Sequence, residues 1–511
     1  MSHVFRSSLI LAFFFSIDKV MGLLRQVLVA RQFGLTYNID VFNAANNIPD
    51  LLSALISGGA LGVALIPVLS EYLEKRGRAE AWHLFSRILN LAFIVTGALA
   101  IIIIIFAQPM VEYVIAPGFP VEQKILTVEL MRLDLVAILL FSISGLVMAG
   151  LQANQHFLLP AMAPLFYNLG QIFGVWILAP ESGHQIGGFT FPAFGLGIHG
   201  LVFGVIIGAL LHLSIQIPGL LKYGFRWVPV IGLNTPGVQK VLHLLGPRVV
   251  TMLFIQIYFV ARDNLASRLG EGSVSALNYG WFIMQVPETL IGTAIAIVLL
   301  PTLSEYVARG EMEKFKETLN KALRVLVALS IPVSAMLAVG VKPLVGVLGF
   351  DASGSERVVL ATQIYLLGLL GHSLLEISSR SFYAQQNART PLYAAAIMVV
   401  VFLGCAIFYT SILGFVGIAL ANVTAFTLEA IILLYLLNRK LPGVIRVWDI
   451  LPRVIFAAVL CALIVYVILN WVPFYPDRSL FGAGYGLVVL ALGGLVMLPF
   501  VWKELKLMVR L

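Results

Sequence analysis

The chain has 511 residues, of which 60% are hydrophobic and only 11% are charged, and its mean hydropathy is +0.98. This balance excludes a soluble globular protein, because apolar runs of about twenty residues recur along the whole chain. The formal net charge of +8 is typical of basic loops that fix membrane orientation, so we expect no nucleic-acid partner. Cys405 and Cys461 lie in apolar runs and are interpreted as small core residues rather than as a disulfide or metal pair.

Apolar segments predict about fourteen transmembrane helices, and the charges between them predict their orientation. The candidate spans are centred near residues 20, 55, 97, 140, 168, 207, 253, 291, 332, 370, 400, 425, 460 and 490. Lys and Arg gather in alternate loops and in the C-terminal tail, so by the positive-inside rule both termini are expected in the cytoplasm. No small-residue cleavage site follows the first apolar run, which is therefore interpreted as a retained helix rather than a signal peptide.

The first span carries charges that are costly in a membrane. It reads FFFSIDKVMGLLRQVLVARQFG and includes Asp18, Lys19 and Arg25. A charge at the bilayer centre costs about 3 kcal/mol or more, so such residues normally face a bundle interior or a water-filled cavity. Two interpretations stay open. Asp18 forms a neutralised structural pair with Lys19 or Arg25, or the cationic groups line a cavity for an anionic cargo.

Three short sequence echoes predict two parallel repeats. ALIPVLSEY at 64–72 matches VLLPTLSEY at 298–306, residues 153–156 match 384–387, and the Leu-Gly pair at 196–197 matches 413–414. Each half then has an even number of spans, so both copies enter the membrane from the same side. We predict an all-α polytopic fold with two six-helix lobes around a central cavity, followed by a helix pair. The expected ranges are 1–225 for the N-lobe, 226–442 for the C-lobe and 443–511 for the C-terminal helix pair.

Charged residues inside other spans are the remaining site candidates. Glu129, Arg132 and Asp134 lie within one and a half turns and either satisfy one another or belong to a site. Glu376 and Arg380 stand at i,i+4 in the acid-first order, which is typical of an ordinary helix pair.

Some acids have no such simple partner. Glu429 stands alone in an apolar helix and is the best candidate for a proton- or ion-coupling carboxylate. An acid directly follows a proline within a span of each half, at Asp50 and at Glu288. We predict charge-pair or gating roles for Asp18, Asp50, Asp263 and Glu288.

Signatures of covalent chemistry are absent from the sequence. It contains no GxxxxGK[ST] phosphate loop, no HExxH, no CxxC and no histidine spacing that suggests a metal site. We therefore predict a transporter rather than an enzyme, with no catalytic residue, no bound metal and no cofactor. Directional movement would depend on a coupling cation, on the membrane potential or on downstream consumption of the cargo.

The first two spans and several later segments resemble a known family. They include VMGLLRQVLVARQFGLTYNIDVFNAANNIPDLL, GGALGVALIPVLSEY, LLPAMAPLFYNLG, GSVSALNYG and VLLPTLSEY. These segments resemble the MurJ (MviN) branch of the multidrug/oligosaccharidyl-lipid/polysaccharide exporter superfamily, and the resemblance covers nearly the whole chain. It implies a flippase of the bacterial inner membrane. Such a flippase moves lipid II, the undecaprenyl-pyrophosphate-linked peptidoglycan precursor, to the outer leaflet by alternating access. It also implies that cationic groups in the cavity bind the pyrophosphate.

The resemblance also implies particular site residues. Arg25 and Asp40 sit where the family has an arginine and an aspartate, and Lys19 takes the position of another cavity arginine. Ser53 and Phe282 stand where the family carries arginines, and Arg262 is hypothesised to supply one of these charges. The predicted substrate-binding residues are Lys19, Arg25, Asp40, Asn168, Gln256 and Arg262.

Other functions stay open at this point. The chain could move another polyprenyl-linked glycan, or act as a cation-coupled exporter of small molecules that uses Glu429 or Asp50. It could also be a non-transporting scaffold for envelope assembly. A net positive cavity would support the pyrophosphate cargo, and a neutral one would favour the exporter or the scaffold. The expected partners are lipid II and membrane lipid, and we expect a monomer.

Overall fold

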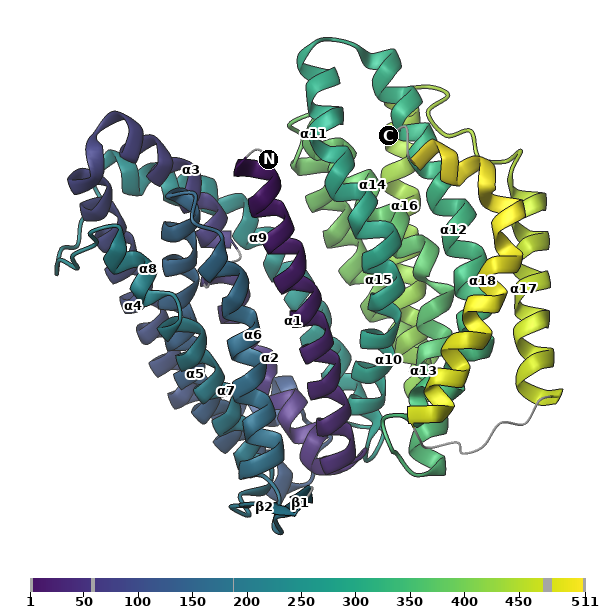
Figure 1. Ribbon diagram of the computed structural model, residues 1–511, viewed down its shortest axis with the longest axis horizontal. Coiled ribbons are helices and arrows are strands. Elements are labelled where there is room, and N and C mark those ends of the chain that lie inside the picture. Colours follow the sequence, from purple (N-terminus) through teal and green to yellow (C-terminus); the bar gives the residue numbers. More distant parts are fainter. Residues whose placement is uncertain (1–2, 57–59, 187, 472–479, 509–511) are drawn as a thin grey trace. The chain divides into compact units, whose positions relative to one another are not determined.

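The computed structural model describes residues 3–56, 60–186, 188–471 and 480–508, which are almost entirely helical (Figure 1). By packing, the chain forms two compact units, Met1–Arg268 and Leu269–Leu511. The first contains the following elements: α1 (His3–Phe33), α2 (Tyr37–Ile56), α3 (Ala60–Lys75), α4 (Gly77–Pro109), η1 (Met110–Ile115), α5 (Val121–Ala153), α6 (Leu158–Phe173), η2 (Gly174–Leu178), β1 (His184–Ile186), β2 (Phe189–Phe191), α7 (Gly197–Ser214), α8 (Ile217–Lys222) and α9 (Pro236–Ala266). The η segments are π-helical, and β1 pairs with β2 as an antiparallel hairpin.

The second unit consists of helices and connecting loops, without a strand among its described residues. Its elements are α10 (Ser273–Glu288), η3 (Thr289–Thr293), α11 (Ala294–Ala308), α12 (Met312–Gly346), α13 (Ala352–Leu367), α14 (Leu369–Ala384), α15 (Arg389–Leu413), α16 (Phe415–Lys440), α17 (Leu451–Trp471) and α18 (Leu480–Met508). α17 and α18 pack against each other and against α12.

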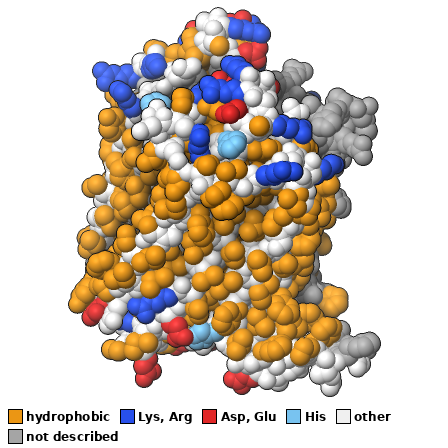
Figure 2. Space-filling model, turned by 90° about the vertical axis from the view of Figure 1, so that its left-hand side faces the viewer, with side chains coloured by type: hydrophobic (Ala, Val, Ile, Leu, Met, Phe, Trp, Pro, Cys, Tyr) orange, Lys and Arg blue, Asp and Glu red, His pale blue; other side chains and the backbone are white. Residues whose placement is uncertain are grey.

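The described residues contain ten helices that are long and apolar enough to cross a membrane, or eleven if α13 and α14 form one span bent by 45°. Short helices do not pass on their own; α3, for example, has only 16 residues. The predicted number of about fourteen therefore stays a prediction, whereas the multi-pass helical fold is confirmed. Figure 2 shows the matching surface, a broad hydrophobic band with most Lys and Arg side chains gathered beyond one of its edges.

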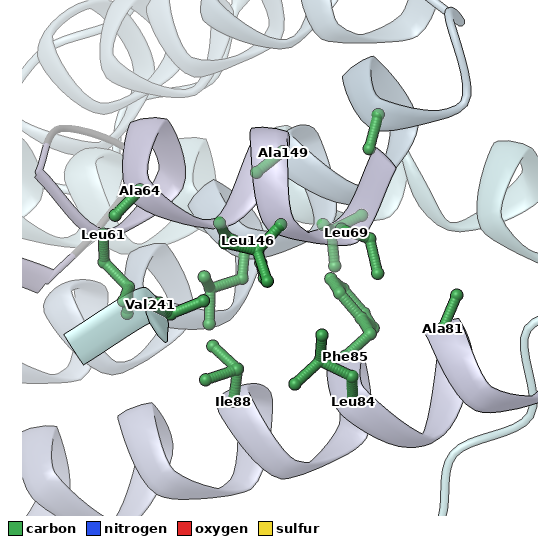
Figure 3. Packing of buried hydrophobic residues seen from close by; sticks show 14 of the residues in the cluster. Leu61, Ala64, Leu69, Ala81, Leu84, Phe85, Ile88, Leu146, Ala149 and Val241 are labelled. Atoms are coloured by element: carbon green, nitrogen blue, oxygen red, sulfur yellow. The ribbon is translucent and has the colours of Figure 1, made fainter. Parts of the chain in front are cut away.

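The first unit has a dense apolar core where α3, α4, α5 and α9 meet (Figure 3). Leu65, Leu69 and Phe85 are fully buried there, and Val241 brings α9 into the same cluster. At one end of this core, Lys240 Nζ on α9 lies 2.5 Å from Glu71 Oε2 on α3. These contacts explain why α9 belongs to the first unit, although the predicted N-lobe ended at residue 225. The predicted lobes were defined by six spans each rather than by packing, and their ranges stay a prediction.

The crossing of α6 and α7 depends on glycines. A Cβ atom on Gly174 would lie 2.6 Å from the Cα of Gly204, and one on Gly208 would lie 2.6 Å from the carbonyl oxygen of Tyr167. Gly170 also faces Gly208 with no room for a side chain. Small residues let two backbones approach closely in a membrane, where lipid tails leave little hydrophobic drive for helix association. The Gly204–Gly208 spacing in the sequence therefore marks a real close contact.

Backbone geometry confirms the sequence repeat. Gln155 and Gln386 are the only non-glycine residues with positive φ in the described part of the chain, at 57° and 56°. Each lies in its own copy of the echo at 153–156 and 384–387, directly after α5 and after α14. A left-handed conformation is unfavourable for residues with a side chain, so its recurrence at matching positions reflects two related folding units.

Buried histidines join helices within each unit. Ser144 Oγ on α5 lies 2.5 Å from His212 Nδ1 on α7, and Gln216 Nε2 donates to the same Ser144 Oγ at 3.0 Å. In the second unit, His372 Nε2 on α14 lies 3.1 Å from Asn422 Oδ1 on α16. No group of His, Cys, Asp and Glu suited to a metal ion occurs among the described residues. His212 and His372 each link two helices of their own unit.

Candidate functional site

The charges of α1 meet α6 through one hydrogen bond. Asn168 Nδ2 donates to Asp18 Oδ1 at 2.8 Å, and Gly22, one turn after Asp18, lies against the same amide. Lys19 is exposed and Arg25 is half-buried. Neither forms an ion pair or side-chain hydrogen bond within the described residues. The predicted structural pair of Asp18 with Lys19 or Arg25 is therefore not formed, and both cations stay available on this helix.

A second pair of opposite charges, on α9, forms a buried ion pair. Arg262 Nε donates to Asp263 Oδ1 at 2.8 Å, with side-chain exposures of only 3% and 2%. Asn47 Nδ2 on α2 donates to the other oxygen of Asp263 at 2.9 Å, and the Arg262 guanidinium lies 5.0 Å from the ring centre of Phe259. Opposite charges buried this way largely neutralise each other. The hypothesis that Arg262 replaces a missing cavity arginine stays a prediction, and in this structure its charge faces a carboxylate.

Acids on α2 and α5 lie near these groups. Asp50 is exposed and interacts electrostatically with Asp263 and with Asp134. Asp134 on α5 is buried, and its Oδ1 has no hydrogen-bond partner among the described residues. Tyr167 on α6 interacts electrostatically with Arg25, Asp134 and Asp50. Tyr167 therefore lies near the acids of α2 and α5 and near Arg25 of α1.

Two further predicted residues lie on the same helices. Asp40 is buried in the first turn of α2. Gln256 is half-buried on α9, six residues before Arg262. All six predicted substrate-binding residues and three of the predicted gating residues, Asp18, Asp50 and Asp263, thus belong to the first unit. The structure does not assign them a ligand.

The accessible charge of this site is mixed. The cations Lys19 and Arg25 stand against the carboxylates of Asp18 and Asp50, while Arg262 and Asp263 offset each other. The site is therefore not strongly cationic by formal charge. What it offers an anion is two cations that form no ion pair or hydrogen bond with a described side chain, one of them a guanidinium fork that matches phosphate geometry.

Of the two interpretations left open for Glu129, Arg132 and Asp134, the structure does not support the one in which they satisfy one another. Arg132 donates to the carbonyl oxygen of Ile104 at 3.1 and 3.2 Å, and Glu129 Oε1 lies 3.2 Å from His199 Nε2. Only Asp134 joins the interior site.

The second unit has its own polar group around η3. Glu288 accepts from Thr293 Oγ1 at 3.1 Å, and Arg380 Nη1 lies 3.4 Å from the carbonyl oxygen of Thr293. Arg380 Nη2 also lies 2.9 Å from Glu376 Oε2, which confirms the predicted i,i+4 pair. A π-helical turn frequently marks a functional position in a helix. The gating role predicted for Glu288 stays a prediction, but this acid does begin such a turn.

Glu429 on α16 is a buried acid of the second unit. Only 5% of its surface is exposed, and it makes no hydrogen bond or ion pair with any described residue. Tyr383 on α14 interacts electrostatically with this carboxyl group. A buried carboxylate without a partner is expensive in its ionised form, so binding of a proton or cation would stabilise it.

Sequence reasoning missed Asn47 and Tyr167. Asn47 donates a hydrogen bond to the buried ion pair of α9, and Tyr167 lies near three charged residues. Both are polar residues within candidate spans, and Tyr167 directly precedes Asn168 in the sequence. Their polarity within an apolar span could have identified them, but the sequence analysis considered mainly charged residues, and neither residue carries a charge.

Charged residues held inside a multi-pass helical bundle are the kind of site that membrane transporters use. Solved structures agree on the fold. The structure titled "Lipid II flippase MurJ, inward closed conformation" is similar with a TM-score of 0.78 and 22% identity, over 98% of this chain and 100% of that one. An inward-facing multidrug resistance MATE family transporter of the MOP superfamily is similar with a TM-score of 0.68 and 15% identity, over 84% and 95%.

Sequence comparison identifies the family. The family profile described as "Lipid II flippase MurJ" matches residues 29–481. The Lipid II flippase MurJ of Burkholderia cenocepacia is 30% identical over 453 residues, 86% of this chain and 84% of that protein. The probable lipid II flippase MurJ of Vibrio cholerae is 29% identical over 435 residues, 82% and 80%. The chain belongs to the lipid II flippase MurJ family.

Proposed function

We propose that this chain moves lipid II across the bacterial inner membrane, from the cytoplasmic to the outer leaflet, with both of its termini in the cytoplasm. Family membership supports the cargo. The observation that carries the proposed site is the pair of cations on α1, Lys19 and Arg25, neither of which has a partner among the described residues. A pyrophosphate offers several oxygens to an arginine fork and to a lysine point charge.

Asp18 and Asn168 hold α1 in the position that this role requires. The hydrogen bond from Asn168 fixes Asp18 toward α6, where it forms no ion pair with Lys19 or Arg25 among the described residues. Asn168 Oδ1 is buried and has no hydrogen-bond partner in the described part of the chain. It can accept from a hydroxyl or amide group of a sugar-peptide headgroup, since an unmet buried acceptor is costly.

The driving force is the second part of the proposal. Glu429 binds a proton or a cation, and its charge state couples the transport cycle to an ion gradient or to the membrane potential. Its burial without a partner supports this role. Glu429→Gln keeps the size of the side chain but cannot be ionised. We expect this variant to reach the membrane and bind cargo, and to lose the acceleration of flipping by an imposed gradient.

The test is growth rescue in bacterial cells depleted of their own lipid II flippase. We expect rescue by the unaltered chain and by Lys124→Ala, a control that removes a cation elsewhere in the first unit. Arg25→Ala and Lys19→Ala should fail although they reach the membrane.

Purified protein in vesicles with lipid II then separates the remaining outcomes. Flipping that is lost in Arg25→Ala supports the proposal directly. A folded chain that neither rescues growth nor flips lipid II refutes it. Movement of another polyprenyl-linked glycan, or of a small amphipathic molecule, would identify a different transporter, and movement of none would favour a scaffold.

A further inference from the structure

The connections that follow α8 and α16 repeat one pattern at the spacing of the sequence repeat. In each, a lysine ends the helix, a glycine adopts positive φ, and an arginine and then a tryptophan follow. The glycines have φ of 74° and 79°. The residues are Lys222, Gly224, Arg226 and Trp227 in the first unit, and Lys440, Gly443, Arg446 and Trp448 in the second.

The first connection is held rigidly with its tryptophan outside. Asn90 Nδ2 on α4 donates to the carbonyl oxygens of Val228 and Val230, both at 2.9 Å. Its Oδ1 accepts from Trp227 Nε1 at 2.8 Å. The indole N–H is thus satisfied, yet the side chain is 58% exposed. An aromatic ring this exposed and this firmly fixed is presented to something outside the protein.

In the second connection, other residues fix the backbone and the tryptophan is again exposed. Asn320 Nδ2 on α12 donates to the carbonyl oxygen of Val444 at 3.0 Å, and Arg324 Nη1 donates to that of Arg446 at 2.9 Å. Trp448 is 74% exposed. Different side chains fix the backbone in the two units, and both leave a tryptophan outside. The exposed ring is therefore the shared feature.

The arginines beside these rings form no salt bridge with the described residues. Arg226 and Arg446 are exposed, and neither guanidinium forms an ion pair or hydrogen bond within the described residues. Asp449, the nearest acid in the second connection, binds Arg324 through both carboxylate oxygens, at 2.7 and 2.8 Å. It is thereby kept from neutralising Arg446.

We propose that each connection is a docking site for the phosphate headgroup of an anionic phospholipid. Tryptophan prefers the level of lipid headgroups, where its ring is in apolar surroundings and its N–H end in polar ones. A guanidinium binds phosphate oxygens, and a basic residue at an anionic leaflet gains about 1 kcal/mol, about a fivefold preference. Other cations lie beside each connection: the Arg78 guanidinium lies 5.7 Å from the ring centre of Tyr223 in the first unit, and Arg324 and Arg453 lie beside Asp449 and Glu504 in the second. This inference does not depend on the identity of the transported cargo.

The test uses the full chain in vesicles of phosphatidylcholine that contain a small fraction of brominated phosphatidylglycerol or, separately, brominated phosphatidylcholine. Bromine quenches tryptophan fluorescence on contact. The signals of Trp227 and Trp448 are obtained by subtracting Trp227→Phe and Trp448→Phe from the unaltered chain. We expect quenching that corresponds to about a fivefold preference for the anionic lipid at each tryptophan.

Matched variants make the result specific. Arg226→Gln should reduce the preference at Trp227 to near one and leave Trp448 unchanged, and Arg446→Gln should do the reverse. Lys124→Gln, which removes one positive charge elsewhere, should change neither. Equal quenching by both lipids, or a preference that survives the arginine variants, overturns the proposal. Absence of quenching also overturns it, because the rings would then face water or a protein partner.

Discussion

The buried pair of Arg262 and Asp263 gives the sharpest test of what stabilises the first unit. Asp263→Leu would leave the Arg262 guanidinium, now 3% exposed, without the carboxylate that lies 2.8 Å from its Nε. Breaking a buried ion pair from one side costs about 3–5 kcal/mol. Asn47 would also lose the acceptor 2.9 Å from its amide, for about 1 kcal/mol more. We therefore expect this single variant to lose about 4–6 kcal/mol of unfolding free energy.

Removing both charges should be far milder. Arg262→Met with Asp263→Leu replaces the pair by apolar side chains, which is often neutral or stabilising, so stability should return to within about 1 kcal/mol of the unaltered chain. Equilibrium unfolding of the purified protein in mixed detergent micelles measures these differences. Glu305→Ala, in a pair with side-chain exposures of 63% and 53%, should change stability by less than about 0.5 kcal/mol. A double variant as unstable as the single one would refute the reasoning.

Two further predictions concern helix packing and an external ion pair. Gly174→Ala places a methyl group 2.6 Å from the backbone of Gly204 and should cost about 1–3 kcal/mol. Gly404→Ala, a helical glycine with open space around it, should be neutral or stabilising in the same unfolding assay, and equal losses in both would contradict the packing argument. The hydrogen bonds and charge of Arg324 lower the pKa of Asp449 below 3.8, so Asp449→Asn should be destabilising at pH 7. That difference should vanish as the pH falls through the lowered pKa, and a difference that persists at pH 2 would refute this assignment.

Patterns of local origin were predictable from the sequence. The apolar runs specify membrane helices because unpaired backbone groups are not tolerated in lipid. The repeat was visible because two units that fold alike need the same turn residues, as Gln155 and Gln386 show. Glu376 and Arg380 were predictable because helix geometry alone brings i and i+4 together. Sequence spacing within one helix carries this information directly.

Pairings between helices could not be predicted. Asp18 bonds to Asn168, 150 residues away, and no local pattern selects that partner. A mutual contact of Glu129 and Arg132 was one of two open interpretations, and the structure gives them His199 and a backbone carbonyl on other elements as partners. Helix spacing limits which residues share a face, and tertiary packing decides what that face meets. The sequence therefore predicts helices more successfully than it predicts the partners of individual side chains.

The observed partner of Arg262 affects which cations are expected to bind the cargo. From the family resemblance, Arg262 was the candidate to supply one of the two charges absent at Ser53 and Phe282. The structure places Arg262 against Asp263, so its use by a cargo would require breaking that buried pair. Lys19 and Arg25 need no such rearrangement, and they lie before residue 29, where the match to the family profile begins. The double variant of Arg262 and Asp263 distinguishes the two possibilities. If it is stable and still rescues growth, recognition rests on α1, and if it is stable but inactive, Arg262 leaves its pair to bind the cargo.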